Sequence, residues 1–304
     1  MNSVKKNFVY IILYQLLVIL LPLVTAPYIS RTLGAEKMGI FSYTQSIANY
    51  FVLLAMLGVK NYGNRSIAMV RDNKNEISRA FWSIYTLQLT TSILMTVAYY
   101  LYILTFLRKH TIVAIIQILY IIAASVDITW FFFGLEEFKV TITRNIIIKL
   151  VTTFCIFIFV KTQDDLMLYT LIMASGTLLG QLSVWPFLKK RIHFVRPTFR
   201  DVVSHIRPNL VLFIPVIAVS LYKIMDKIML GSLSTMREVG LYENTEKIIN
   251  VPMGLITALG TVMLPRMANL AAKGDSEESL QYIEKSMFFV MFMAYALSFG
   301  LASI

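Results

Sequence analysis

The sequence is poor in cysteine, histidine and charge: it has one cysteine, three histidines and only 15% charged residues in 304. A lone cysteine, Cys155, forms no intramolecular disulfide, which excludes a disulfide-stapled secreted scaffold. The histidines form no cluster with Cys155 at metal-site spacing, so we predict neither a metal nor a cofactor. Globular domains carry about 25% charged residues. This low charge, combined with 57% hydrophobic residues, excludes a disordered chain and an ordinary soluble domain.

The sequence contains long apolar segments with few or no charged residues. A helix needs about 20 mostly apolar residues to cross a hydrocarbon core roughly 30 Å thick. Nine segments approach or exceed this length: 7–30, 38–59, 80–107, 111–135, 145–160, 166–188, 208–230, 248–265 and 286–304. None alternates as the strands of a membrane barrel do. The sequence therefore predicts an all-α, polytopic integral membrane protein.

The net charge of +11 is unevenly distributed along the chain. With a cytoplasmic N-terminus, nineteen lysines and arginines fall on the cytoplasmic side and six on the outer side. Cytoplasmic loops of membrane proteins are enriched in Lys and Arg, so we predict that the N-terminus is cytoplasmic. Anionic lipid at the inner surface accounts for the basic balance, and no nucleic-acid partner is predicted.

Residues 33–50 and 230–251 resemble each other. With an offset of 201, the matches are Phe41 with Tyr242, Thr44 with Thr245, Ile47 with Ile248, and Asn49 with Asn250. Both copies lie at an outer turn between two spans, and six spans separate them. This predicts two parallel halves, as found in transporters with a central site. We expect a first six-helix lobe at 1–190, a basic cytoplasmic linker at 191–207 and a partial second lobe at 208–304.

Several motifs resemble those of Wzx-type polysaccharide flippases, which belong to the multidrug/oligosaccharidyl-lipid/polysaccharide exporter superfamily. The similar segments are Pro27 to Gly34 followed by Gly39-Ile40-Phe41, Trp130 to Lys139, Met225 to Gly231, Val239 to Tyr242, Glu246 to Ile248, and Pro265-Arg266. The resemblance covers essentially the whole chain. It implies a two-lobed, V-shaped transporter of twelve or more helices, of which this chain is expected to stop within a ninth span.

The resemblance also implies a function. Members of that family translocate undecaprenyl-diphosphate-linked oligosaccharides from the cytoplasmic to the outer leaflet, for surface or capsular polysaccharide. A bacterial plasma (inner) membrane location is therefore expected. The expected partners are the lipid-linked oligosaccharide, membrane lipids and other membrane proteins of polysaccharide assembly.

Six ionisable residues lie within two adjacent spans. They are Lys223, Asp226 and Lys227 in the seventh, and Glu243, Glu246 and Lys247 in the eighth. The i, i+3, i+4 spacing places each trio on one helix face, and a turn near residue 235 places the trios at similar depth. One hypothesis is that the trios neutralise each other, with Asp226 paired to Lys247. The other is that the lysines contact phosphate or acidic sugars and the carboxylates release them.

These hypotheses give two candidate sets. The predicted substrate-binding residues are Arg31, Lys223, Lys227 and Lys247. The predicted ion-coupling or charge-relay residues are Asp127, Asp226, Glu243 and Glu246. Purely structural interpretations stay open: Arg31 as an interfacial arginine, and Asp127 as a carboxylate that is hydrogen-bonded to a neighbouring Ser or Thr. The aromatic run 130–133 is expected to form an interfacial belt.

The sequence shows no Gly-rich phosphate loop and no nucleophile–base pair, so we predict a transporter and no catalytic residues. Two alternatives remain. A membrane polysaccharide polymerase or glycosyltransferase would be expected to have a long outer loop, whereas every outer loop here is short. A multidrug or cation exporter of the same superfamily would need an acidic, aromatic pocket, whereas the candidate cations here are lysines.

Overall fold

The computed structural model describes residues 2–189, 191–273 and 276–303, which form helices and no strand. The elements are α1 (Asn2–Met56), α2 (Val59–Val70), α3 (Lys74–Phe106), η1 (Arg108–His110), α4 (Thr111–Ser125), α5 (Thr129–Gly134), α6 (Phe138–Phe159), η2 (Gln163–Asp165), α7 (Leu166–Leu182), α8 (Trp185–Leu188), α9 (Phe199–Ser204), α10 (Ile206–Leu233), α11 (Met236–Lys273) and α12 (Ser276–Ala302). Seven helical stretches of the described residues are long and apolar enough to span a membrane. The chain is therefore an all-α, multi-pass membrane protein, as predicted.

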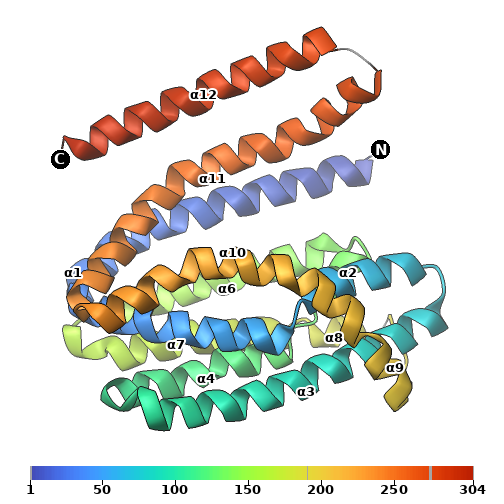
Figure 1. Ribbon diagram of the computed structural model, residues 1–304, viewed down its shortest axis with the longest axis horizontal. Coiled ribbons are helices and arrows are strands. Elements are labelled where there is room, and N and C mark those ends of the chain that lie inside the picture. Colours follow the sequence, from blue (N-terminus) through green and yellow to red (C-terminus); the bar gives the residue numbers. More distant parts are fainter. Residues whose placement is uncertain (1, 190, 274–275, 304) are drawn as a thin grey trace.

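The first two predicted spans, 7–30 and 38–59, are the two arms of α1. They meet at Gly34, the non-helical residue inside this element, whose φ is 77° and ψ 166°. Glycine reaches this region without a steric penalty because it has no Cβ. The chain reverses there, and Figure 1 shows the two arms extending from the turn toward the same side, with opposite chain directions. The predicted spans leave a connection at 31–37, but in the structure Gly34 is the only non-helical residue of that stretch.

In the region of the predicted first lobe, α1 packs against α3, α4 and α6, while α7 packs against α4 and α6. Trp130, Phe131 and Phe132 are buried in the core of this region. The prediction of an interfacial aromatic belt was therefore wrong for these three residues. Trp130 is held by a hydrogen bond of 3.0 Å from its indole Nε1 to the Gln88 side chain. Its ring lies against Gly63, where a Cβ would come within 2.5 Å of it.

The predicted linker, 191–207, contains α9 and is fastened to the first lobe. Arg79 forms an ion pair of 2.8 Å with Asp201, and the Trp82 indole donates a hydrogen bond of 3.0 Å to the backbone carbonyl of His193. The predicted lobe boundary at Lys190 lies outside the described residues, as do the chain ends at 1 and 304. These contacts place the entry to α10 beside α2 and α3.

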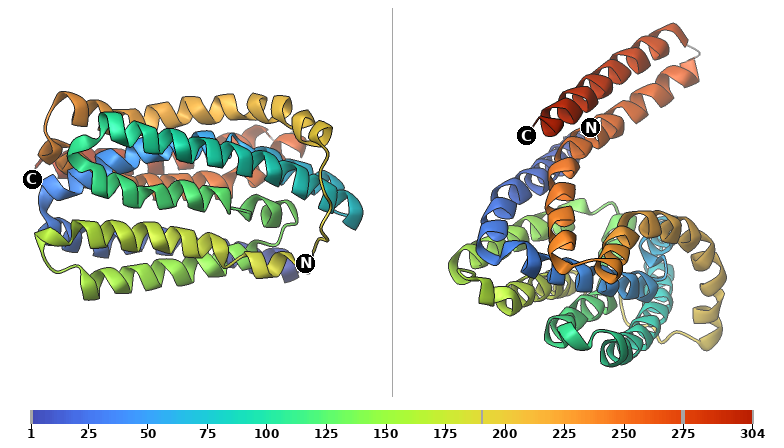
Figure 2. Two further views of the ribbon diagram at one scale, coloured as in Figure 1. Left: turned by 90° about the horizontal axis from the view of Figure 1, so that it is seen from below. Right: turned by 60° about the vertical axis from the view of Figure 1, so that its left-hand side comes forward.

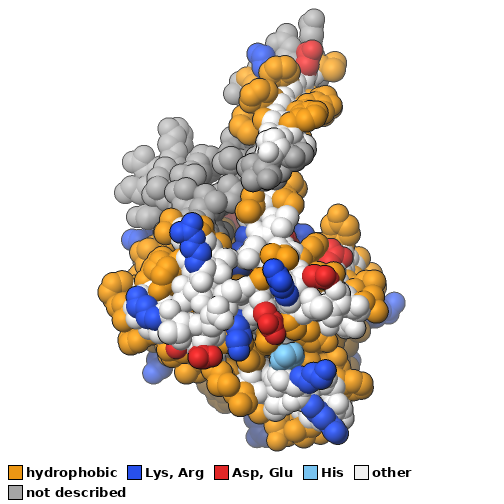
Figure 3. Space-filling model, turned by 90° about the vertical axis from the view of Figure 1, so that its left-hand side faces the viewer, with side chains coloured by type: hydrophobic (Ala, Val, Ile, Leu, Met, Phe, Trp, Pro, Cys, Tyr) orange, Lys and Arg blue, Asp and Glu red, His pale blue; other side chains and the backbone are white. Residues whose placement is uncertain are grey.

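The helices after the linker complete the arrangement. α10 lies along the second arm of α1, and α11 makes the most extensive contact with α1 of any helix. α11 then leaves the bundle, and α12 returns beside it (Figure 2). Viewed from the end that holds the α1 turn, hydrophobic side chains lie around the flanks and charged side chains lie on the end face (Figure 3). Apolar flanks with polar ends suit a protein immersed in a bilayer.

Candidate functional site

The two copies of the sequence repeat touch each other through glycines. A Cβ on Gly39 would lie 1.6 Å from the Met236 carbonyl oxygen, and one on Gly240 would lie 1.8 Å from the Ala35 carbonyl oxygen. Positions 39 and 240 are equivalent in the 201-residue register, and so are 35 and 236. The contact is therefore reciprocal, as expected around an approximate two-fold axis. Only residues without a Cβ allow this close approach of backbones.

A network of charged residues adjoins this contact. The Ser42 hydroxyl donates a hydrogen bond of 2.6 Å to Glu243, its equivalent in the repeat register. Glu243 and Glu246 each lie 2.6 Å from the Lys227 ammonium, and Lys247 lies 3.3 Å from Glu243. We call Lys227, Glu243, Glu246 and Lys247 the charge cluster. Its two positive and two negative charges balance, as paired charges at membrane depth are expected to do.

The predicted pairing of Asp226 with Lys247 was wrong. Asp226 accepts a hydrogen bond of 2.7 Å from the Tyr242 hydroxyl, and Lys247 pairs with Glu243 one turn earlier on its own helix. Asp226 is exposed on α10, whereas the next residue, Lys227, faces α11 and pairs with its glutamates. Lys223 is exposed on α10. It lies within 4.0 Å of no acidic group among the residues described.

A cavity of about 200 Å³ lies between α1, α6 and α7 of the predicted first lobe and α11 of the predicted second lobe, and we call it the inter-lobe cavity. Thr25 of α1, Lys149 and Thr152 of α6, Tyr169 of α7 and Lys247 of α11 are among the residues that line it. It therefore brings a lysine from each predicted lobe to one space. Lys149 was not among the predicted site residues, because a single lysine in an apolar span is typical of a side chain that snorkels to the interface.

Two further predicted residues lie away from this cavity. Asp127 is buried, accepts hydrogen bonds from the Thr129 hydroxyl and amide, and lies 3.7 Å from the Lys60 ammonium. These contacts match the structural interpretation, in which Asp127 is hydrogen-bonded to a neighbouring Thr. Arg31 is exposed on α1 just before the turn at Gly34. Their predicted roles in coupling and substrate binding stay predictions.

An all-α membrane bundle with a lysine-bearing cavity between its helices is the arrangement expected of the transporter class. The model of one family, described as polysaccharide biosynthesis protein, matches residues 4–271 of the chain. The chain belongs to this family.

Two known proteins are similar in sequence to most of this chain. A protein of Escherichia coli (strain K12), named "Putative O-antigen transporter", is 27% identical over 278 residues, which is 88% of this chain and 65% of that protein. A protein of Shigella dysenteriae with the same name is 22% identical over 271 residues, which is 88% of this chain and 68% of that protein. The chain thus spans about two thirds of the length of these relatives. No solved structure matches it.

Proposed function

We propose that this chain acts as, or within, a flippase that carries an undecaprenyl-diphosphate-linked oligosaccharide from the cytoplasmic to the outer leaflet of the bacterial plasma membrane. The N-terminus is cytoplasmic in this proposal, as the distribution of Lys and Arg favours. Support comes from membership of the polysaccharide biosynthesis family and from two relatives named for O-antigen transport. The proposed partners are the lipid-linked glycan and other membrane proteins of glycan assembly.

The observation that carries the proposal is the convergence of Lys149 and Lys247 on the inter-lobe cavity. A diphosphate that enters between apolar helices loses its hydration, and fixed cations must compensate for the loss. Lysine suits this task because its ammonium is a compact charge on a flexible side chain, so it can follow a phosphate group in more than one position. The hydroxyls of Thr25 and Thr152 offer further hydrogen bonds to phosphate or sugar oxygens.

The charge cluster supplies a means of release. Lys247 both lines the cavity and lies 3.3 Å from Glu243, at the long end of an ion pair. A phosphate that approaches Lys247 would compete with Glu243, which keeps its bonds to Lys227 and Ser42. The carboxylate is therefore not left uncompensated during binding, and it draws Lys247 back once substrate departs. The chain then binds and moves its substrate without breaking a covalent bond.

The binding step is tested with the purified chain and two probes, undecaprenyl diphosphate and the uncharged undecaprenol. We expect the diphosphate to bind more tightly, and the Lys149→Gln/Lys247→Gln double variant to lose most of that preference. Lys139→Gln is the matched control, because Lys139 lies exposed near the start of the same helix as Lys149. Equal binding of both probes, or an unchanged preference in the double variant, would refute a diphosphate site in this cavity.

The transport step is tested by expressing the chain in a bacterium that lacks its own flippase. Surface polysaccharide and lipid-linked oligosaccharide retained on the inner leaflet are measured together. We expect the Lys149→Gln/Lys247→Gln variant to increase the retained pool and reduce the surface pool, with Lys139→Gln equal to the unmodified chain. A variant that inserts normally and transports normally would contradict the proposed role of both lysines.

A further inference from the structure

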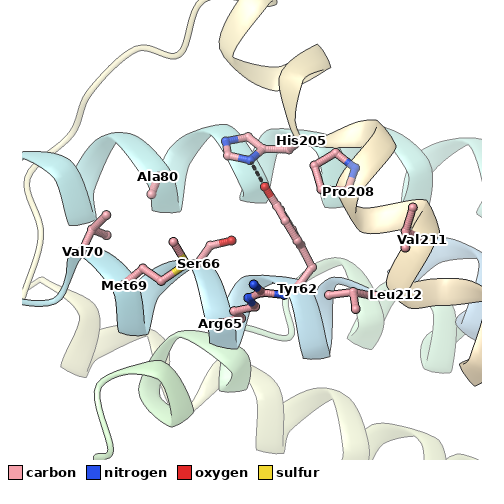
Figure 4. Close-up of a pocket in the computed structure, with 10 residues that line it drawn as sticks. All are labelled: Tyr62, Arg65, Ser66, Met69, Val70, Ala80, His205, Pro208, Val211 and Leu212. Carbon is pink, nitrogen blue, oxygen red and sulfur yellow. Dashed lines mark hydrogen bonds between the residues drawn. The ribbon is translucent and has the colours of Figure 1, made fainter.

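A second, larger crevice opens where α2 and the start of α3 meet the entry to α10. Its volume is about 600 Å³. Among its lining residues are Tyr62, Arg65, Ser66, Met69, His205 and Val211. It shares no lining residue with the inter-lobe cavity. Figure 4 shows side chains from α2 on one side of the crevice and side chains from the α9–α10 connection and α10 on the other.

One part of the crevice is polar. The Tyr62 hydroxyl and His205 Nδ1 lie 2.6 Å apart and join α2 to the entry of α10. Arg65, one turn of α2 further on, is exposed and lies within 4.0 Å of no carboxylate among the described residues. The acidic side chain closest to His205 in sequence, Asp201, is already bound by Arg79. The guanidinium of Arg65 is therefore left available, and its geometry suits a phosphate group.

The other part of the crevice is apolar and accessible. Met69 of α2 and Val211 of α10 line the same space. Their side chains are 75% and 61% exposed. Val70 and Leu212 add to this lining. A strip of aliphatic side chains beside an unpaired arginine matches an amphiphile with an anionic headgroup and a hydrocarbon chain.

With the proposed cytoplasmic N-terminus, the crevice lies on the side of the membrane where such a ligand is found. His205 lies in the predicted cytoplasmic linker at 191–207, and the other lining residues lie on α2, at the start of α3 and in the first turns of α10. Arginine and lysine at this level face the anionic headgroups of the inner leaflet, with an attraction of about 1 kcal/mol for each basic residue. Charge complementarity thus favours a lipid of that leaflet.

We propose that this crevice binds one anionic phospholipid of the cytoplasmic leaflet. Its phosphate lies against Arg65, with the hydroxyl of Ser66 beside it, and an acyl chain follows Met69 and Val211. The bound lipid fills the crevice between α2 and α10 and supplements the Tyr62–His205 bond there. The crevice is separate from the inter-lobe cavity, so this inference does not depend on substrate binding there, but it rests on the cytoplasmic N-terminus of the proposed function.

The test is a titration of the detergent-purified chain with phosphatidylglycerol and phosphatidylcholine of identical acyl chains, followed by native mass spectrometry. We expect a saturable first site that prefers phosphatidylglycerol. Arg65→Gln should weaken the binding of phosphatidylglycerol to this site about fivefold and leave phosphatidylcholine unchanged. Arg200→Gln is the matched control, because Arg200 is an exposed arginine at the same predicted level that does not line the crevice.

A second variant tests the apolar part of the site. Val211→Trp should occupy the crevice and abolish the saturable site for phosphatidylglycerol while Arg65 is intact, and the exposure of Val211 makes the larger side chain tolerable. Equal affinity for the two lipids, or an Arg65→Gln variant that binds phosphatidylglycerol normally, would overturn the proposal. So would displacement of phosphatidylglycerol from this site by undecaprenyl diphosphate at equal concentration, since the crevice would then belong to the substrate path.

Discussion

Replacement of Gly39 by alanine is a direct perturbation of the contact between the repeats. The added methyl carbon would lie 1.6 Å from the Met236 carbonyl oxygen and 2.9 Å from the Gly240 nitrogen. Both neighbours are backbone atoms, so no side chain can rotate away to make room. The two helices would have to move apart by about 1.4 Å before even the tightest normal contact of 3.0 Å was restored.

The expected cost follows from two opposing effects. Alanine is preferred to glycine in a helix interior by about 1 kcal/mol. Overpacking of a closely packed contact costs about 1–3 kcal/mol, and a backbone neighbour places this case at the upper end or beyond. We therefore expect Gly39→Ala to destabilise the chain by at least ~1–2 kcal/mol. Thermal unfolding of the purified chain in detergent, followed by circular dichroism, should show a midpoint lower by several degrees.

A matched control and a double variant make the test specific. At Gly180 an added Cβ would meet only side-chain atoms of Ile148 and Arg144 at 3.5–3.8 Å, so Gly180→Ala should be neutral or stabilising. Gly240→Ala should cost about as much as Gly39→Ala. The double variant should cost less than the two single changes added, since one separation of the helices accommodates both methyl groups. Equal melting of Gly39→Ala and Gly180→Ala would refute the close approach.

Three other outcomes are expected. Ser42→Ala removes a hydrogen bond to a carboxylate and should lower the free energy of unfolding by about 1.5–3 kcal/mol in the same melting assay, and no change would mean that this bond contributes nothing. Lys227→Met removes the cation that Glu243 and Glu246 share and should reduce the yield of folded protein. Lys223→Met, at an exposed lysine, should leave the yield unchanged. Equal yields of the two variants would argue against the charge cluster. Reporter fusions after Lys74 should give a cytoplasmic signal and fusions near Lys109 an external one, and the reverse pattern would overturn the orientation.

Much of the fold could be predicted because membrane spans are determined by local composition. A long run of apolar residues has few alternatives in a bilayer, so segments such as 80–107 and 208–230 correspond closely to α3 and α10. The repeat register was also accessible, and it relates Ser42 to Glu243 by the same offset as the matched residues. That hydrogen bond could have been proposed from the sequence by asking which polar residues the register aligns.

The features that sequence could not supply are those that depend on which faces of two helices meet. Trp130 belongs to an aromatic run that would also suit a membrane interface, and its burial follows from the space that Gly63 leaves on another helix. Lys149 is typical of a snorkelling lysine until α6 and α11 are placed around one cavity, where it gains Lys247 as a neighbour across the lobes. The i, i+4 spacing is enough to suggest the pair of Lys247 with Glu243, whereas the pairs of Lys227 with the two glutamates depend on how α10 meets α11. A lone charge in a span should therefore be assigned a role only after its helix face has been placed against a partner.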